Sequence, residues 1–321
     1  LTTPLVNTLY GRVSDLQVTN IKAPYFISEI RGTAETVTIN DARFENKTTD
    51  SLDACAGFAI RFSQGLIENC HIINASILGT GFIYDTADRG TEGTIKECSI
   101  VNATIAGTGF INNNGITVEN CGIYSDPDLY DKNQINNYAP CRGSNGNYDY
   151  VSIGISPEGI RSSYDIAGFI LNQAHGKVSI RNCYVAGTIY GDRDHEMSGF
   201  VGIISDNLEE FEVKDCYANV VFDSEGNVNG FASKLGSGSS KITNCHVLGV
   251  IKCAQHASGM VRIINGGQIS NCYSAFWEVN VDTWSPFYET MSGNNVSNCY
   301  YLSDYKLHAN NLISVQYDKN K

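Results

Sequence analysis

The stretch IRNCYVAGTIYG at Ile180–Gly191, followed by SGFVG at Ser198–Gly202, decides the fold of this chain. Its side chains alternate in the way of a β-strand, so that Cys183 and Val185 point to one side and Tyr184 to the other. The apolar side of this strand is built from small and β-branched residues, which favour strands over helices. We therefore predict a strand with one buried and one exposed face.

A corner precedes this strand. Ile180 and Cys183 are both apolar, and they can both point inward only if the chain bends at Arg181 and Asn182. Asparagine suits such a bend because it tolerates a left-handed backbone conformation and because its amide can hydrogen-bond along a stack. The stretch is therefore interpreted as strand, corner, strand.

Both signatures recur along the chain. An aliphatic residue, a spacer and Asn-Cys, or a degenerate form of this pattern, ends at eight cysteines: Cys70, Cys98, Cys121, Cys183, Cys216, Cys245, Cys272 and Cys299. A Gly-Phe pair alternates with it, at Phe58, Phe82, Phe110, Phe169, Phe200 and Phe231, with Met260 and Phe287 in later copies and Leu5 and Phe26 in earlier ones. Extrapolation backwards assigns the Cys position to Leu16 and Ala42.

A repeat of this length with two-residue alternation inside each unit is typical of a β-solenoid. We predict an all-β protein, a right-handed parallel β-helix of about ten coils, in which the cysteines and phenylalanines form buried structural ladders. The helix is expected to be one domain over residues 1–302, with 303–321 as a tail or a last strand. Helical repeats lack this pattern, and the blades of a β-propeller are longer than these units.

One interval, from Cys121 to Cys183, is about twice as long as the others, which predicts a loop insertion over about residues 125–163. Insertions of this kind often carry function. Four of its tyrosines are candidate sugar-binding residues: Tyr130, Tyr138, Tyr148 and Tyr150. The alternative is a flap that covers the edge of a coil.

Composition limits the classes of function. The net charge of −12 argues against nucleic acid as a partner and against an anionic membrane surface, and no apolar run is long enough for a membrane-spanning helix. The eleven cysteines contain no CxxC pair, so no metal site and no cofactor is predicted. Cys55, Cys141 and Cys253 lie off the ladder, and their disulfide state is left open.

The stretches quoted above, together with ISNCYS at Ile269–Ser274 and NCYYL at Asn298–Leu302, resemble the GLUG-motif repeats of large bacterial and archaeal surface proteins. Related repeats occur in the non-catalytic part of some secreted metallopeptidases that cleave immunoglobulin A, but this chain has no HExxH motif. The resemblance implies a β-solenoid at the cell surface or outside the cell.

The favoured hypothesis is a non-catalytic extracellular adhesin, stalk or fibre-forming domain. Its partners would be glycans or cell-surface proteins, or further copies stacked end to end through open sheet edges. The alternatives are a carbohydrate-active enzyme on a β-helix and a spacer module of a larger secreted protease. No catalytic residue is assigned, because Glu97 and Asp215, the acidic residues next to the Cys positions, lie in coils too far apart to converge.

Overall fold

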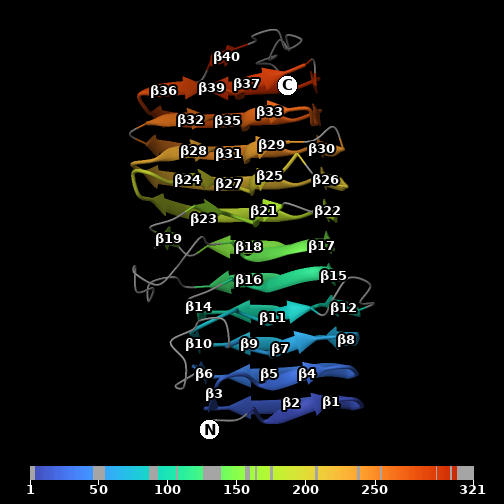
Figure 1. Ribbon diagram of the computed structural model, residues 1–321. Helices are drawn as coiled ribbons and strands as arrows, with labels where there is room; N and C mark the ends of the chain where they lie inside the picture. Colours follow the sequence, from blue (N-terminus) through green and yellow to red (C-terminus); the bar gives the residue numbers. More distant parts are fainter. Residues whose placement is uncertain are drawn as a thin grey trace, which may run out of the picture. The chain divides into compact units, whose positions relative to one another are not determined.

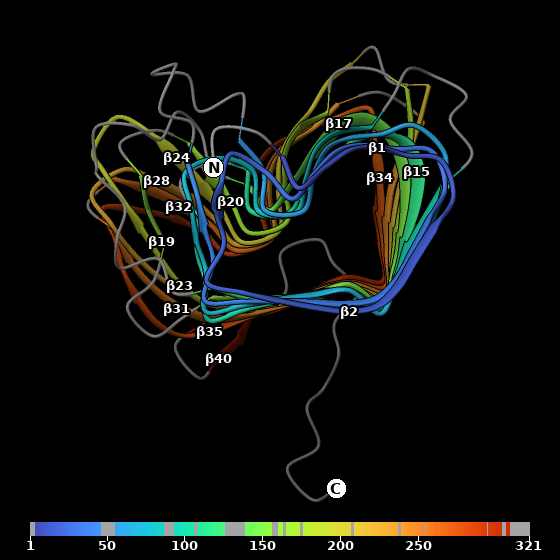
Figure 2. The ribbon, with the colours of Figure 1, turned by 90° about the horizontal axis from the view of Figure 1, so that it is seen from below.

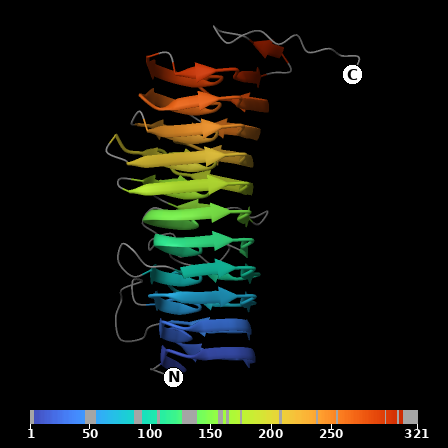
Figure 3. The same cartoon turned by 90° about the vertical axis from the view of Figure 1, so that its right-hand side faces the viewer.

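The computed structural model describes residues 4–45, 55–86, 93–105, 108–125, 139–155, 160–162, 165–173, 176–206, 209–236, 239–253, 255–293, 295–303 and 306–308. These residues are all-β, and their strands form a parallel β-solenoid. The chain divides into two compact units, Leu1–Ser163 and Tyr164–Lys321. Within each unit, Figures 1 and 3 show successive coils lying one above the other.

In the first unit, parallel strands stack in three ladders, and one further strand, β19 (Ile160–Ser162), follows them. One ladder contains β1 (Val6–Leu9), β4 (Ile27–Ile30), β7 (Ala59–Phe62), β11 (Ile83–Thr86), β15 (Ile111–Glu119) and β17 (Cys141–Asp149). The next contains β2 (Arg12–Thr19), β5 (Thr33–Asn40), β8 (Gly65–Glu68), β9 (His71–Ile73), β12 (Gly93–Lys96), β13 (Ser99–Val101), β16 (Gly122–Ser125) and β18 (Ser152–Ile155). The third contains β3 (Lys22–Ala23), β6 (Arg43–Phe44), β10 (Ser76–Ile77) and β14 (Thr104–Ile105).

In the second unit, each coil contributes a strand to each of four ladders. The first two ladders are β20 (Ile166–Ala167), β24 (Glu196–Ser198), β28 (Asn227–Asn229), β32 (His256–Ser258) and β36 (Thr283–Ser285), and β21 (Ile170–Gln173), β25 (Val201–Ile204), β29 (Ala232–Leu235), β33 (Val261–Asn265) and β37 (Tyr288–Ser292). The other two are β22 (Lys177–Arg181), β26 (Glu210–Lys214), β30 (Ser240–Thr243), β34 (Gln268–Ser270) and β38 (Val296–Ser297), and β23 (Tyr184–Gly191), β27 (Tyr217–Ser224), β31 (His246–Cys253), β35 (Tyr273–Asn280) and β39 (Tyr300–Ser303). A last strand, β40 (Lys306–His308), pairs antiparallel with β39.

The predicted β-solenoid is confirmed, but the number of coils differs slightly from ten, because the described strands form a six-strand ladder in the first unit and five-strand ladders in the second. The prediction of a single domain over residues 1–302 stays a prediction. The prediction of a last strand within 303–321 also stays a prediction beyond His308, because those residues lie outside the described part of the chain.

The predicted insertion over residues 125–163 is wrong for its second half. Residues 141–155 form strands β17 and β18, which pair in parallel with β15 and β16 of the preceding coil. Tyr150 lies at the corner and Val151, which is fully buried, follows it in the place of Cys121. This coil was missed because its corner reads Tyr-Val instead of Asn-Cys.

The corner before each Cys position has a left-handed backbone, with φ between 50° and 56°. Asparagine occupies most of these corners, as at Asn182, Asn244 and Asn271, because this conformation is strained for residues other than Gly, Asn and Asp. The asparagines also bond from coil to coil: Asn271 Nδ2 donates to Asn244 Oδ1 over 3.1 Å. Corner chemistry and stacking thus favour the same residue type.

The glycine before each phenylalanine allows two coils to approach closely. A Cβ atom on Gly199 would lie 2.0 Å from the carbonyl oxygen of Gly230, and one on Gly230 would lie 1.9 Å from that of Gly259. The phenylalanines that follow are fully buried and stack, with ring centroids 4.9 Å apart for Phe169 and Phe200. The Gly-Phe signature therefore combines close backbone contact with an inner aromatic ladder.

One register assignment was wrong. Ala42 was expected in the Cys position of the second coil, but Val37 lies there, because Leu16 pairs with Val37 and Thr38 pairs with His71. Ala42 instead lies beside Ala75, since the amide of Ser76 donates to the Ala42 carbonyl. The error arose because this coil carries neither Asn nor Cys at its first corner.

Candidate functional site

The tyrosines predicted to bind sugars are not brought together. Tyr130 and Tyr138 lie outside the described residues. Tyr148 is 2% exposed and points into the core beside Val118, so its ring is not available to a ligand. Tyr150 is 60% exposed, but it is a single corner residue.

The eight ladder cysteines are all buried, and so are the six ladder phenylalanines. Each cysteine Sγ donates to a backbone carbonyl two residues earlier, as Cys216 does to Lys214 over 3.1 Å. Burial raises the pKa of the Cys98 and Cys245 thiols well above the ordinary value. Hydrogen bonds from neighbouring ladder thiols instead lower the pKa of Cys70 and Cys272. All eight cysteines are buried, so they act as small packed side chains whatever the direction of the shift.

The off-ladder cysteines behave similarly where they are described. Cys55 and Cys141 are fully buried and free, and burial raises the pKa of Cys55 to about 12. The side chain of Cys253 lies outside the described part of the structure. Among the described residues, no group of His, Cys, Asp or Glu could hold a metal ion.

An aromatic column lies on the outer face of the second unit, at the position directly after the inner cysteines. Tyr184, Tyr217, His246 and Tyr273 stack from coil to coil, with ring centroids 5.2, 5.1 and 4.7 Å apart and interplanar angles of 7°, 4° and 2°. We call these four residues the outer column. Figure 2 places the strands that carry it, among them β23, β31 and β35, along one side of the second unit.

The geometry of the outer column determines what it can bind. Because the rings stack on one another along the coil axis, their faces are occupied and their edges point to solvent. Tyr217 is 37% exposed and Tyr273 is 41% exposed, so part of each ring edge is accessible. Partial burial lowers the pKa of His246, so that this imidazole is neutral at pH 7. The column thus presents a regular row of uncharged ring edges.

One aromatic residue beside the column stands apart from the stack. The register of β31 and β35 shifts between Gly249–Phe276 and Val250–Glu278, which leaves Trp277 as the extra residue of a β-bulge. Bulges of this kind re-aim a side chain. Trp277 is 46% exposed and shares the outer face of β35 with Tyr273, four residues earlier. Val221 and Asp223 on β27 are also exposed, and so is Glu278 next to Trp277, so the face combines apolar and charged side chains.

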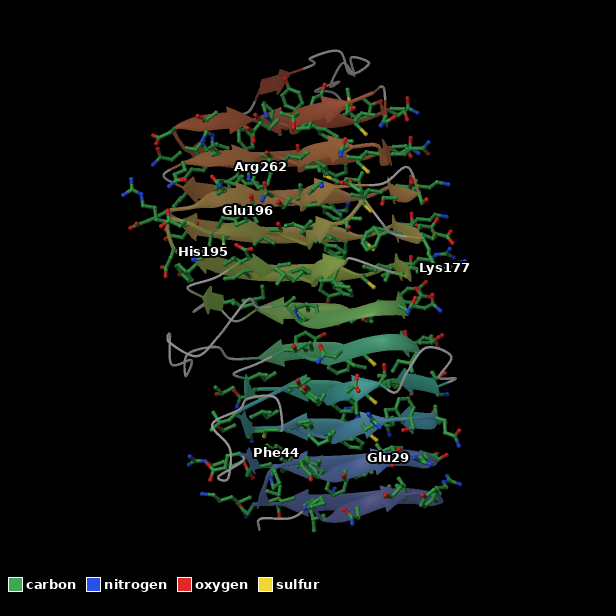
Figure 4. The ribbon with its side chains drawn as sticks, viewed as in Figure 1. Glu29, Phe44, Lys177, His195, Glu196 and Arg262 are labelled. Atoms are coloured by element: carbon green, nitrogen blue, oxygen red, sulfur yellow. The ribbon has the colours of Figure 1, made fainter. Side chains whose placement is uncertain are left out.

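A second feature of the same unit is a polar cluster around Glu196, which we call the Glu196 cluster: Asp165, Glu196, Ser233, Arg262 and Glu289. The Glu196 carboxylate accepts hydrogen bonds from Ser233 Oγ and from the Arg262 guanidinium, and its backbone amide donates to Asp165 Oδ1 over 2.9 Å. Arg262 Nε also contacts Glu289 Oε2 at 3.0 Å. Figure 4 shows Glu196 and Arg262 on the same side of the second unit, two coils apart.

Chain topology explains why this cluster forms. Glu196 lies on β24, whereas Ser233 and Arg262 lie on β29 and β33, in the next two coils and past the bend that carries the Gly-Phe signature. The side chain of Glu196 is 27% exposed and that of Arg262 is 23% exposed, so the cluster is half-buried. In the sequence, Glu196 ends the charged segment 192–196, which reads as an exposed polar turn or, as the alternative, a cation site. No local pattern links it to Ser233 and Arg262, because these positions are far apart in the chain.

Comparisons with known proteins add nothing to this description: no family model, no curated protein and no solved structure matches the chain. In the part of the chain that the structure describes, no helix has the length and apolar character needed to cross a membrane.

Proposed function

We propose that the chain is a non-catalytic extracellular β-solenoid of the adhesin type, which binds extended glycan chains on the outer face of its second unit. The observation that carries this proposal is the exposed Trp277 held beside the outer column. An indole with a free face stacks on the C–H face of a sugar ring, and tryptophan combines a large apolar area with a polar N–H.

The outer column supports the same ligand. Its rings repeat once per coil, at spacings of 4.7 to 5.2 Å. A polymer that lies along the coil axis would meet one ring edge per coil, and the tyrosine hydroxyls both donate and accept hydrogen bonds, as sugar hydroxyls do. A regular row of this kind suits a repeating ligand better than a compact one.

The chemistry of this face favours binding over catalysis. The outer column and Trp277 contain no carboxylate, so they lack the two acidic groups with which most glycoside hydrolases work. The resemblance to GLUG-motif repeats supports a place at the cell surface or outside the cell, and the net charge of −12 disfavours anionic polymers as ligands. The proposed ligand is therefore a neutral polysaccharide.

The test is a titration of the full chain with plant, microbial and mucin glycans by calorimetry, with reducing ends and unsaturated products measured in the same mixtures. We expect binding without product release. Trp277→Ala should weaken binding at least tenfold, about 1.4 kcal/mol. The control is Tyr124→Ala, which removes a tyrosine that is 45% exposed on the outer face of the first unit and should leave affinity unchanged.

Release of products would replace the proposal with a carbohydrate-active enzyme. Absence of binding to every glycan would favour a stalk or spacer. Unchanged affinity in Trp277→Ala would show that the ligand lies elsewhere.

A further inference from the structure

We infer that the glycan of the outer column is a straight, ribbon-like chain of pyranose rings linked through equatorial bonds at C1 and C4, which lies along the coil axis with one sugar per coil. Cellulose, mannan and chitin are chains of this kind. The inference rests on the proposed function and deepens it, because it names the linkage geometry of the ligand and the direction in which the ligand lies.

The strand register makes the outer column a straight row. Tyr184 pairs with Tyr217, and Tyr217 pairs with His246. His246 pairs in turn with Tyr273, and no shift in register occurs at any of these positions. Because each coil contributes one ring at the same strand position, the row runs parallel to the axis along which the coils of this unit stack.

The rings of this row are also evenly spaced. Neighbouring ring centroids are 4.7 to 5.2 Å apart. A pyranose ring linked through equatorial bonds at both ends advances its chain by about 5 Å, which is close to the spacing of hydrogen-bonded strands. A sugar chain of this geometry therefore stays in register with the coils over the length of the column.

Other linkages do not provide this match. An axial bond at C1, as in α-1,4-linked glucans, or a bond to C3, as in β-1,3-linked glucans, winds the chain into a helix, so that successive sugars turn away from a straight row. The outer column does not turn with such a helix, because neighbouring rings stay within 7° of parallel. The geometry of the column thus favours a flat ribbon.

The ligand also has a defined place across the strands. Two residues beyond the column, each coil carries a second outward position, and these positions form a parallel row in register: Ala186, Asn219, Leu248 and Ala275. Trp277 lies two residues beyond Ala275 on β35 and is 46% exposed. A chain that lies above this second row therefore contacts the outer column on one side and Trp277 on the other.

The charged side chains of this face fit an uncharged sugar. Asp223 and Glu278 are exposed, and carboxylates accept hydrogen bonds from sugar hydroxyls. They also repel carboxylated and sulfated sugars. Lys252 pairs in register with Asp223 and offsets only one of the two negative charges. The face therefore favours a neutral ribbon over an acidic one.

The test compares oligosaccharides of two to six sugars by calorimetry on the full chain. The ribbon series are the cello-, manno- and N-acetylated chito-oligosaccharides, and the helical series are the α-1,4-linked malto- and the β-1,3-linked laminari-oligosaccharides. For at least one ribbon series, we expect affinity to rise by roughly tenfold or more from the disaccharide to the hexasaccharide, because each added sugar reaches one more coil. The helical hexasaccharides should bind at least tenfold more weakly than the ribbon hexasaccharide.

A variant at the far end of the column tests the direction of the ligand. Tyr184 lies in the coil of the column most distant from Trp277. Tyr184→Ala should therefore lower hexasaccharide affinity several-fold and leave disaccharide affinity unchanged, a dependence on length that a loss of stability alone does not produce. The matched control is Tyr190→Ala, which removes a tyrosine of the same strand outside both rows and should change neither affinity.

The outcomes separate this inference from the proposed function. Helical oligosaccharides that bind as tightly as the ribbon series, affinity that does not rise with length, or full hexasaccharide affinity in Tyr184→Ala would each overturn the inference. The proposed function would stand in those cases if Trp277→Ala still weakened binding. Absence of binding to every glycan would overturn both.

Discussion

Each unit has an inner ladder of the same kind, and the two units differ in what lies directly outside it. At the position after the inner cysteine or its substitute, the later coils of the first unit carry His71, Ser99, Gly122 and Ser152. The same position in the second unit carries the outer column, Tyr184, Tyr217, His246 and Tyr273. The inward positions therefore specify the coil, whereas the outward positions are free to vary and can acquire a binding function.

The largest expected effect tests whether the inner ladder is equivalent in the two units. Phe82→Ala in the first unit and Phe200→Ala in the second each remove a fully buried ring stacked on both neighbours. We expect each to lower the free energy of unfolding by about 3–5 kcal/mol, measured by chemical denaturation. A loss confined to one unit would show that the two cores are not built alike.

A smaller effect is expected from the outer positions, where the units differ. Tyr217→Ala removes two stacked ring contacts and should cost about 1–3 kcal/mol, because each such pair is worth about 0.5–1.5 kcal/mol. Ser99→Ala, at the same position in the first unit, removes one half-buried hydrogen bond to His71 and should cost about 1 kcal/mol or less. Equal losses, again from denaturation curves, would remove the distinction between the two faces.

The smallest effect concerns pH. Partial burial lowers the pKa of His246 and of His71 below the unfolded value. Because the folded state resists protonation, the stability contribution of each histidine is fully present above about pH 6.5 and declines as the pH falls through the lowered pKa. His246→Tyr, which preserves the outer column, should reduce the loss of stability between pH 7 and pH 5, measured by the melting temperature.

His71→Asn is the counterpart in the first unit. It should reduce the same acid loss without affecting the outer column. A pH profile that neither substitution alters would mean that the acid sensitivity arises from other groups.

Much of the fold could be predicted from sequence because the same side chains recur at each coil. Asn182 and Cys183 identify a corner and a buried position by residue type alone, and their copies locate the other coils. The coil at residues 141–155 was not recognised because Tyr150 stands at its corner and Val151 at its buried position, where most coils have Asn and Cys. A sequence pattern thus identifies a structural position only where the chain places the same residue type there as in the other coils.

The candidate sites were less predictable for a physical reason. Trp277 becomes significant only through a one-residue shift in register, which no periodic pattern predicts. The Glu196 cluster depends on a bend that brings Glu196 to Arg262 across two coils.

Hydroxyl-radical footprinting of the full chain, with and without the glycan that binds most tightly, tests the central claim most directly. We expect Trp277, Tyr273 and Tyr217 to be oxidised in the free protein and protected in the complex, while Tyr124 and Tyr150 are oxidised equally in both. Protection of Tyr124 or Tyr150 with no change at Trp277 would contradict it.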